Sequence, residues 1–456
     1  MIHFFNFVLS VLLSAYAILY YDFYVTNPVD LISFFVYTNE VPPITYSYFI
    51  LIKFLIIFAI LFSCIDYWYP LVFFKVFKEK FHFALQKCRA CTSIGLYLFF
   101  LVFVVNQAIN LKSIFEKTDI YENMKTEFTV PPKNARKNVI LIIVESLENT
   151  YGNEKLFGRN LIPQLSKMPA LGDYRQIIGT GNTASAMTGI LCGVPTAARL
   201  KNLLLSNVFP SFKNLVCLSD ILKQNGYKNY FYTSDTVSFA NKDVFLKAHS
   251  FDEIKGAETL IKTDDDKGFS LFNGAADSKL LEFARERLSS GKTGKPFFMV
   301  LLTLNMHEPK GFLEKSCKKG DKDDFTDIVR CTDDQLTDFV KKLEVMSDYK
   351  NTVIVIVGDH KARPNSVFSD LKKEKNRTLF NTVLNASAPE KRRIFSPLDL
   401  GPTLLSLAGF GNQAKLGLGV SIYADNANFL ELLEPENLDK ELMKHSKKYN
   451  ALLSGK

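Results

Sequence analysis

Two apolar stretches of the sequence are followed directly by residues of types that commonly bind metal ions in proteins. Residues 139–144 are apolar without interruption and are followed by Glu145, and residues 352–358 are followed by Asp359 and His360. Carboxylate oxygens and an imidazole nitrogen are common ligands of zinc and manganese in proteins. These three side chains therefore form a candidate site for one divalent cation. In the alternative interpretation, Glu145 only marks the end of a strand, and His360 only caps a helix or bonds to a carbonyl.

A hydroxyl group that such a metal ion could activate lies in residues 177–195, IIGTGNTASAMTGILCGVP. We expect a short apolar strand at the start of this segment and a helix after it, joined through Gly179 and Gly181. Glycines let the backbone approach a phosphate, and a helix N-terminus attracts an anion. Thr183 thus lies where a metal could lower its hydroxyl pKa and make it a nucleophile. The competing interpretation is an ordinary helix N-cap, a role that threonine fills well.

Strands and helices alternate through the later part of the chain. Besides residues 138–144, apolar β-rich stretches occur at 227–234, 295–304, 351–359 and 377–386, and helical patterns occur at 277–290 and 333–346. This alternation is typical of an α/β fold with a central, mostly parallel sheet flanked by helices. In such sheets ligands gather beyond the carboxyl ends of the strands, which is where Glu145 and Asp359 would lie.

The first part of the chain has a membrane-protein composition. Apolar stretches near bilayer length occur at residues 4–21, 54–65 and 91–109, so we expect about three transmembrane helices within residues 1–110. A cleaved signal peptide would also explain the first stretch, but that stretch has no basic n-region and two more follow it. We assign residues 111–135, which contain a Pro-Pro pair, to a linker, and residues 136–456 to a catalytic domain.

Charges in the loops predict the orientation of these helices. Residues 22–45 contain three acidic and no basic residues, whereas residues 75–89 contain five basic residues. By the positive-inside rule the second loop is cytoplasmic. We therefore expect a multi-pass protein of the bacterial inner membrane with its catalytic domain in the periplasm. The formal net charge of +8 is modest for 456 residues, and without zinc-finger spacing or an Arg-rich arm it excludes nucleic acid as a partner.

Four of the seven cysteines fall in the predicted exported domain: Cys192, Cys217, Cys317 and Cys331. An even number in an oxidising compartment allows two disulfides. Cys317 and Cys331 bracket a Lys/Asp-rich loop and are the pair that we favour. Unpaired surface thiols are the alternative.

The order of the motifs resembles a known family. NVILIIVESLE, GTGNT…LCGVP, SDTVSFANKDVFLKAHSFDEI, LTLNMHEP and GDH follow the apolar stretches in this order. This arrangement resembles the membrane-anchored phosphoglycerol transferases of the alkaline phosphatase and sulfatase superfamily, and most closely those that modify periplasmic glucans. Lipoteichoic acid synthases are similar but more distant. The resemblance covers roughly residues 136–410, and FSPLDLGPTLLSLAGF at 395–410 is similar to the closing helix of the superfamily.

The resemblance implies a cofactor and a nucleophile. Glu145, Thr183, Asp359 and His360 would hold one divalent metal ion, with Mn²⁺ favoured and Mg²⁺ or Zn²⁺ as alternatives. Thr183 would become covalently loaded with phosphoglycerol.

The resemblance also implies substrate contacts. His307, in LNMHEP, falls at the position of a histidine that contacts the transferred phosphate, and Asp235 and Lys242 fall where acidic and basic residues bind substrate. A histidine could protonate the leaving oxygen or deprotonate the acceptor hydroxyl, because its unperturbed pKa is near neutrality. The alternative for His307 is a packed side chain at a strand end.

Two departures narrow the resemblance. Thr233 and Ala240 stand where a His and a Trp of lipoteichoic acid synthases would bind the glycerol-phosphate group, which favours the glucan-modifying branch and leaves the headgroup open. The Cys-x-Pro-x-Arg motif of sulfatases is absent, since CGVPTAAR has a different spacing. A formylglycine-dependent sulfatase is therefore not expected.

The resulting expectation is a ping-pong transferase. Thr183 would attack phosphatidylglycerol, release diacylglycerol and pass phosphoglycerol to a periplasmic glucan or another glycan acceptor. Phosphoethanolamine transfer to lipid A or a glycan would use the same metal residues and is the alternative reaction. A membrane-tethered sensor or scaffold with an inactive site is the alternative outside the enzymes.

Overall fold

The computed structural model describes residues 116–122, 124, 136–196, 214–269, 273–290, 294–317, 320, 325–391, 393–444 and 446–454. The membrane helices predicted within residues 1–110 lie outside these ranges. The chain divides into two compact units, residues 1–116 and 117–456, and the account below concerns the second. None of the described helices is long and apolar enough to cross a membrane.

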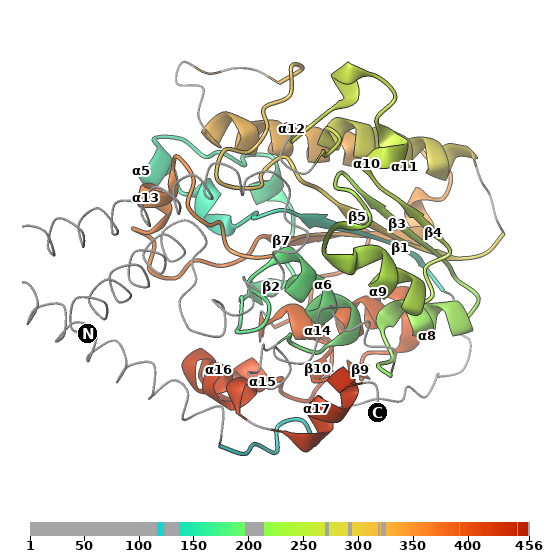
Figure 1. Cartoon of the computed structure of the whole chain (residues 1–456), viewed down its shortest axis with the longest axis vertical. Coiled ribbons are helices and arrows are strands. Elements are labelled where there is room, and N and C mark those ends of the chain that lie inside the picture. Colours follow the sequence, from blue (N-terminus) through green and yellow to red (C-terminus); the bar gives the residue numbers. More distant parts are fainter. Residues whose placement is uncertain are drawn as a thin grey trace, which may run out of the picture. The chain divides into compact units, whose positions relative to one another are not determined.

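A six-stranded sheet forms the centre of this unit, in the order β4-β3-β5-β1-β6-β7 (Figure 1). All neighbouring strands are parallel except β7, which runs antiparallel to β6 at one edge. This confirms the predicted α/β class with a mostly parallel sheet. The bounds are β1 Asn138–Val144, β3 Lys228–Thr233, β4 Glu253–Lys255, β5 Phe297–Leu302, β6 Thr352–Gly358 and β7 Asn381–Leu384.

The central strand β1 is buried along its whole length, because helices cover both faces of the sheet. Val139, Leu141 and Ile143 point into one hydrophobic core, and alternate residues such as Ile140 and Ile142 point into a second core on the other face. A strand buried on both sides has no polar face, and this explains the unbroken apolar run in the sequence.

Different helices cover the two faces (Figure 1). The face of Leu141 packs against α6, α8, α9 and α14, whereas the face of Ile142 packs against α10, α11, α12 and α13. The bounds are α6 Thr183–Cys192, α8 Leu218–Gln224, α9 Lys242–Ala248, α10 Ala257–Leu260, α11 Asp277–Ser290, α12 Phe325–Glu344, α13 Phe368–Leu371 and α14 Pro397–Leu405.

Smaller elements complete the unit. The short strands β2 and β8 pair in parallel, and β9 and β10 pair antiparallel. Their bounds, with those of the remaining helices, are α5 Glu154–Phe157, β2 Gly172–Tyr174, β8 Arg393–Phe395, β9 Lys415–Leu416, β10 Gly419–Val420, α15 Phe429–Leu432, α16 Pro435–Met443 and α17 Lys447–Ser454.

Part of the predicted linker belongs to the compact unit. Residues 117–122 pack against the C-terminal helices, since the Tyr121 hydroxyl donates to the carbonyl of Leu442 at 2.8 Å and its ring lies 4.7 Å from that of Tyr449. The buried Tyr449 hydroxyl in turn donates to the carbonyl of Pro195 at 2.6 Å. Tyr121 is thus linked, through Tyr449 of α17, to Pro195 just after α6.

Candidate active site

The register of the sheet brings Glu145 and Asp359 together. Val144 at the end of β1 pairs with Gly358 at the end of β6, so the next residue of each strand leaves the sheet at the same level. Gly358 is required at this point, because a Cβ atom there would lie 1.8 Å from the carbonyl oxygen of Leu147. Both carboxylates are buried, at 1% and 0% exposure.

His360 turns its Nε2 atom towards these carboxylates. Nε2 lies 3.1 Å from Glu145 Oε1 and 3.4 Å from Asp359 Oδ2. The other ring nitrogen, Nδ1, lies 3.0 Å from the carbonyl of Lys361. A donor hydrogen on Nδ1 leaves the lone pair on Nε2, which is the usual arrangement of a metal-binding histidine. The carbonyl bond considered in the alternative interpretation of His360 is therefore present together with the carboxylate contacts.

Thr183 begins helix α6 but does not cap it. The Asn182 side chain is the cap and accepts from the Ser185 N–H at 2.9 Å. The Thr183 hydroxyl instead donates to Glu145 Oε2 at 3.1 Å and lies 3.5 Å from His360 Nε2. Thr183 is only half-buried, so its oxygen lies at the boundary between the buried ligands and solvent. The prediction of a short strand before this helix is wrong, because Ile177 and Ile178 lie in a loop. There the Thr180 hydroxyl donates to the carbonyl of Ile177, and the Ile178 N–H donates to Asp439.

The charges of the three buried groups depend on one another. Burial opposes ionisation of Glu145, but attraction to His360 and then to His307 outweighs it and holds the pKa of Glu145 well below its usual range. Burial, followed by repulsion from Glu145, raises the pKa of Asp359. Burial disfavours protonated His360, but Asp359 and Glu145 outweigh this effect and raise the pKa of His360 to about 9. The carboxylates thus require a positive charge among them, which a proton or a metal ion can supply.

These residues fit a divalent metal ion. The ligand atoms of Glu145, Asp359 and His360 all lie within 4.8 Å of one another. Asp359 Oδ2 is buried and has no hydrogen-bond partner within the described part of the chain. A buried oxygen without a partner destabilises the folded protein unless a cation binds it. Two carboxylates, one imidazole and one hydroxyl form a donor set of the kind that manganese or zinc accepts.

Asp235 and Lys242 pair with each other at the carboxyl side of β3. Lys242 Nζ donates to Asp235 Oδ2 at 2.7 Å, and both side chains are less than 10% exposed. Ala240 and Asn241, just before Lys242, have positive φ angles of 56°, an unfavourable conformation for residues other than glycine that often occurs at functional sites. A small hollow lined by Ala184, Thr188, Ala240 and Lys242 separates this turn from α6.

His307 lies in the loop after β5, the strand next to β1. Its Nδ1 atom lies 2.7 Å from the carbonyl oxygen of Glu308, so in the neutral ring Nδ1 carries the hydrogen and Nε2 is the basic nitrogen. The ring packs against Phe269 at 5.5 Å. The residue next to it, Glu308, accepts from the Arg363 N–H at 2.7 Å, which joins this loop to the loop that follows Asp359 and His360.

Ser146 is a site residue that the sequence reasoning missed. Its hydroxyl donates to Glu145 Oε1 at 2.8 Å, and its N–H donates to Asp359 Oδ1 at 2.8 Å. A positive φ of 54° makes both contacts possible. The only signal in the sequence was a small polar residue directly after Glu145, which is too common to be informative.

Two disulfides occur in the described part of the chain. Cys317 and Cys331, the favoured pair, have their sulfur atoms 1.96 Å apart, and so do Cys192 and Cys217. The second disulfide joins the end of α6 to the start of α8, so that the helix that begins at Thr183 is tethered at its other end.

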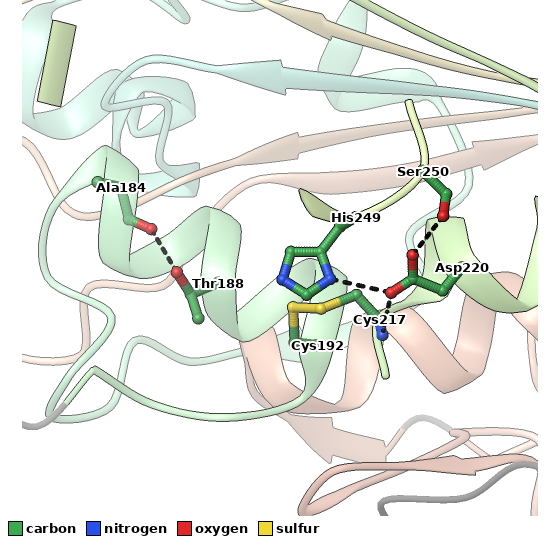
Figure 2. The surroundings of a disulfide bond; sticks show 7 residues. All are labelled: Ala184, Thr188, Cys192, Cys217, Asp220, His249 and Ser250. Carbon is green, nitrogen blue, oxygen red and sulfur yellow. Dashed lines mark hydrogen bonds and ion pairs between the residues drawn. A yellow bond between two sulfur atoms is a disulfide. The ribbon is translucent and has the colours of Figure 1, made fainter. Parts of the chain in front are cut away.

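Polar side chains surround the Cys192–Cys217 disulfide, and Asp220 joins several of them (Figure 2). His249 lies beside the sulfur atoms, and its Nδ1 is 2.9 Å from Asp220 Oδ2. Asp220 also accepts from the N–H of Cys217 and from the hydroxyl of Ser250. This cluster is separate from the Glu145 site and ties the loop after α9 to α8.

The chain is similar in sequence to known proteins. Curated proteins named phosphoglycerol transferase I, from Salmonella paratyphi B and Citrobacter koseri, are 32% identical over 303 residues. These alignments cover 63% of this chain and 39% of the relatives, so the chain spans about two fifths of their length.

Two solved structures share the fold. A Vibrio parahaemolyticus protein of the alkaline phosphatase superfamily has a TM-score of 0.50 at 24% identity, covering 65% of this chain and 72% of that one. The lipoteichoic acid synthase LtaP from Listeria monocytogenes has a TM-score of 0.52 at 20% identity, covering 67% and 80%.

The sulfatase family matches residues 137–410. This range includes the strand that leads to Glu145, the helix that starts at Thr183 and the Asp359–His360 loop. The match covers more than half of the chain, and the sheet and site described above lie within it. The chain therefore belongs to the sulfatase family and has the α/β fold of the alkaline phosphatase superfamily.

Proposed function

We propose that this chain is a metal-dependent phosphoglycerol transferase that moves phosphoglycerol from phosphatidylglycerol to a periplasmic glucan or another glycan and releases diacylglycerol. The position of Thr183 Oγ1, 3.1 Å from Glu145 Oε2 and 3.5 Å from His360 Nε2, carries the proposal. Asn182 caps the helix, so the Thr183 hydroxyl is not needed for that role. It faces the proposed metal ligands instead, as expected of a nucleophile that a metal ion activates. The name of the relatives, phosphoglycerol transferase I, supports the choice of transferred group.

Four residues would hold the metal ion: Glu145, Thr183, Asp359 and His360. Mn²⁺ is our first choice, and Mg²⁺ and Zn²⁺ are the alternatives. When bound, the ion would lower the pKa of the Thr183 hydroxyl and offset negative charge on the phosphodiester.

The proposed reaction has two displacement steps. Thr183 Oγ1 loses its proton to solvent and bonds to phosphorus as the bond from phosphorus to the diacylglycerol oxygen breaks, and His307 gives a proton to that oxygen. His307 then takes a proton from the acceptor hydroxyl, whose oxygen bonds to phosphorus as the bond to Thr183 breaks, and Thr183 Oγ1 regains a proton from solvent. Lys242 offsets charge on the phosphate, and Asp235 holds its ammonium group in place through the 2.7 Å contact.

The location of the enzyme is part of the proposal. The apolar stretches within residues 1–110 would anchor the chain in the bacterial inner membrane and hold the site, in the periplasm, near its lipid donor. Phosphoethanolamine transfer is the alternative, because the same nucleophile and metal ligands would serve both headgroups.

The test is a side-by-side assay with the purified full chain. Phosphatidylglycerol and phosphatidylethanolamine are supplied in separate vesicles with Mn²⁺, Mg²⁺ or Zn²⁺, and diacylglycerol release is measured. We expect release from phosphatidylglycerol together with a phosphoglycerol adduct on the Thr183 peptide by mass spectrometry. Release from phosphatidylethanolamine alone would replace the proposal with the alternative, and no release with any of these ions from folded protein would refute both.

A further inference from the structure

The loop of residues 359–363, called the metal loop below, is held by side chains from three other segments. Three successive backbone N–H groups each donate to a different side chain: Lys361 to Gln176 at 2.7 Å, Ala362 to Glu148 at 3.1 Å and Arg363 to Glu308 at 2.7 Å. Gln176 precedes the nucleophile, Glu148 follows β1 and Glu308 is next to His307. The metal loop is thus bonded to the segments that carry Thr183, Glu145 and His307.

Arg363 makes two of these connections at once. Its backbone N–H donates to Glu308 Oε1, and its side-chain Nη2 donates to the carbonyl of Gly181 at 2.8 Å. Gly181 lies two residues before Thr183. One residue therefore bridges the loop that carries the proposed acid and base and the loop that carries the proposed nucleophile.

The Glu308 end of this bridge controls His307 directly. The Glu308 side chain is buried, at 6% exposure, so its carboxylate depends on protein donors such as the Arg363 N–H for stabilisation. The carbonyl oxygen of the same residue lies 2.7 Å from His307 Nδ1 and sets the tautomer and orientation of the ring. A shift of Glu308 would therefore move the basic nitrogen of His307.

We propose that Arg363 is a positioning residue that fixes His307 relative to Thr183 through the chain of contacts His307–Glu308–Arg363–Gly181. This inference rests on the proposed function, in which both residues act on one phosphorus atom. Thr183 bonds to phosphorus on the side opposite the departing oxygen, and His307 must reach that departing oxygen in the same step. A misplacement of about 1 Å between such groups costs about 100-fold in rate.

A different role for Arg363 predicts a different kinetic result. Arg363 is half-buried as a residue, but the contact of its guanidinium with Gly181 is exposed to solvent near the nucleophile, so the guanidinium could bind the donor phosphate directly, since arginine suits phosphate geometry. Direct binding would appear mainly in KM for the lipid. Positioning would appear in kcat, because the affinity for the lipid and the metal ligands is unchanged.

The kinetic experiment compares Arg363→Ala with Glu308→Ala, Glu308→Gln and the double variant Arg363→Ala/Glu308→Ala. We expect each alanine variant to lower kcat by about 10-fold to 100-fold, with the KM for phosphatidylglycerol and the bound metal content unchanged. Glu308→Gln keeps an acceptor oxygen and should retain most activity. The double variant should lose little more than the worse single variant. Arg363→Ala removes the contact with Gly181, Glu308→Ala removes the contact with the Arg363 N–H, and either loss interrupts the same chain of contacts. Arg285→Ala, on the distant helix α11, is the matched control.

A second measurement does not depend on lipid turnover. The chain has six histidines, so the ring signal of His307 can be assigned by NMR in histidine-labelled protein. Arg363→Ala should shift that signal, and Arg285→Ala should not. If the wild type releases no diacylglycerol, the proposed function fails, and this shift still decides the link. An unmoved His307 signal, a change confined to KM, or strictly additive losses in the double variant would each overturn the inference.

Discussion

Thr183 Oγ1 lies 3.1 Å from Glu145 Oε2, although the two residues are 38 positions apart in the sequence. Glu145 lies at the end of β1, which is buried along its whole length, and Thr183 lies in the first turn of α6. Glu145 faces the Thr183 hydroxyl and also belongs to a buried cluster with Asp359 and His360. We therefore expect Glu145 to act on Thr183 through a cation that both residues bind. The first two predictions test this relationship.

Glu145→Gln should remove the metal without unfolding the protein. Glutamine has nearly the same size but no charge, so the cation loses one of its two carboxylates. We expect metal affinity and diacylglycerol release to fall by at least about 10-fold to 100-fold, the range found when partners of metal ligands are removed. Metal analysis and the lipid assay measure the two quantities. Glu154→Gln, at an exposed position, is the control, and wild-type metal content in Glu145→Gln would remove Glu145 from the site.

Thr183→Ala should separate metal binding from chemistry. The hydroxyl that we propose as the nucleophile is lost, whereas Glu145, Asp359 and His360 remain. We expect the mass of the Thr183 peptide to stay unmodified after incubation with lipid, with part of the metal still bound. Thr183→Ser should regain part of the adduct, and an adduct on another residue in Thr183→Ala would show that Thr183 is not the nucleophile.

Metal binding should release a proton from His360. In the metal-free protein Asp359 and Glu145 outweigh burial and raise the pKa of His360 to about 9. The protonated ring therefore stabilises the metal-free fold fully below its ordinary pKa of about 6.5, and this stabilisation is lost as pH rises through about 9. A metal ion needs the deprotonated ring, so affinity should increase with pH up to that value.

Calorimetry in buffers of different ionisation enthalpy measures this proton. We expect release of about one proton per metal ion at pH 7. Two results would contradict the arrangement of charges in the cluster. One is proton uptake on metal binding, and the other is a metal affinity that stays constant between the ordinary histidine pKa of about 6.5 and about 9.

The Cys192–Cys217 disulfide should stabilise the fold and the position of α6. It closes a loop of 25 residues, so the double substitution Cys192→Ser/Cys217→Ser should lower the free energy of unfolding by about 3 kcal/mol. Denaturant unfolding measures this loss. The Cys317–Cys331 disulfide closes a shorter loop of 14 residues. The double substitution Cys317→Ser/Cys331→Ser should therefore lower the free energy of unfolding slightly less. Only the first pair is joined to the helix of Thr183, so an equal loss of transfer activity in both variants would contradict a role in positioning that helix.

The sequence by itself determined the local features of this protein. The apolar run before Glu145 required a strand buried on both faces, because any polar residue within it would have faced a hydrophobic core. The helical period at residues 277–290 likewise determined α11, whose bounds agree with it. For α12 the same reasoning recovered only the end, since the helix begins at Phe325; its first turns are buried through side chains such as Ile328 and Val329, and the Lys/Asp-rich sequence before them hid this.

Only the tertiary structure decided which of these features meet. Strand register placed Glu145 beside Asp359, and packing of α6 on the sheet turned Thr183 towards Glu145 and His360. The antiparallel direction of β7, the Cys192–Cys217 pair, and the bonds from the metal loop to Gln176 and Glu308 have no local signature. Local sequence patterns reflect burial and periodicity, which act over a few residues, whereas the contacts of this site join segments up to 214 residues apart and depend on how the whole chain packs.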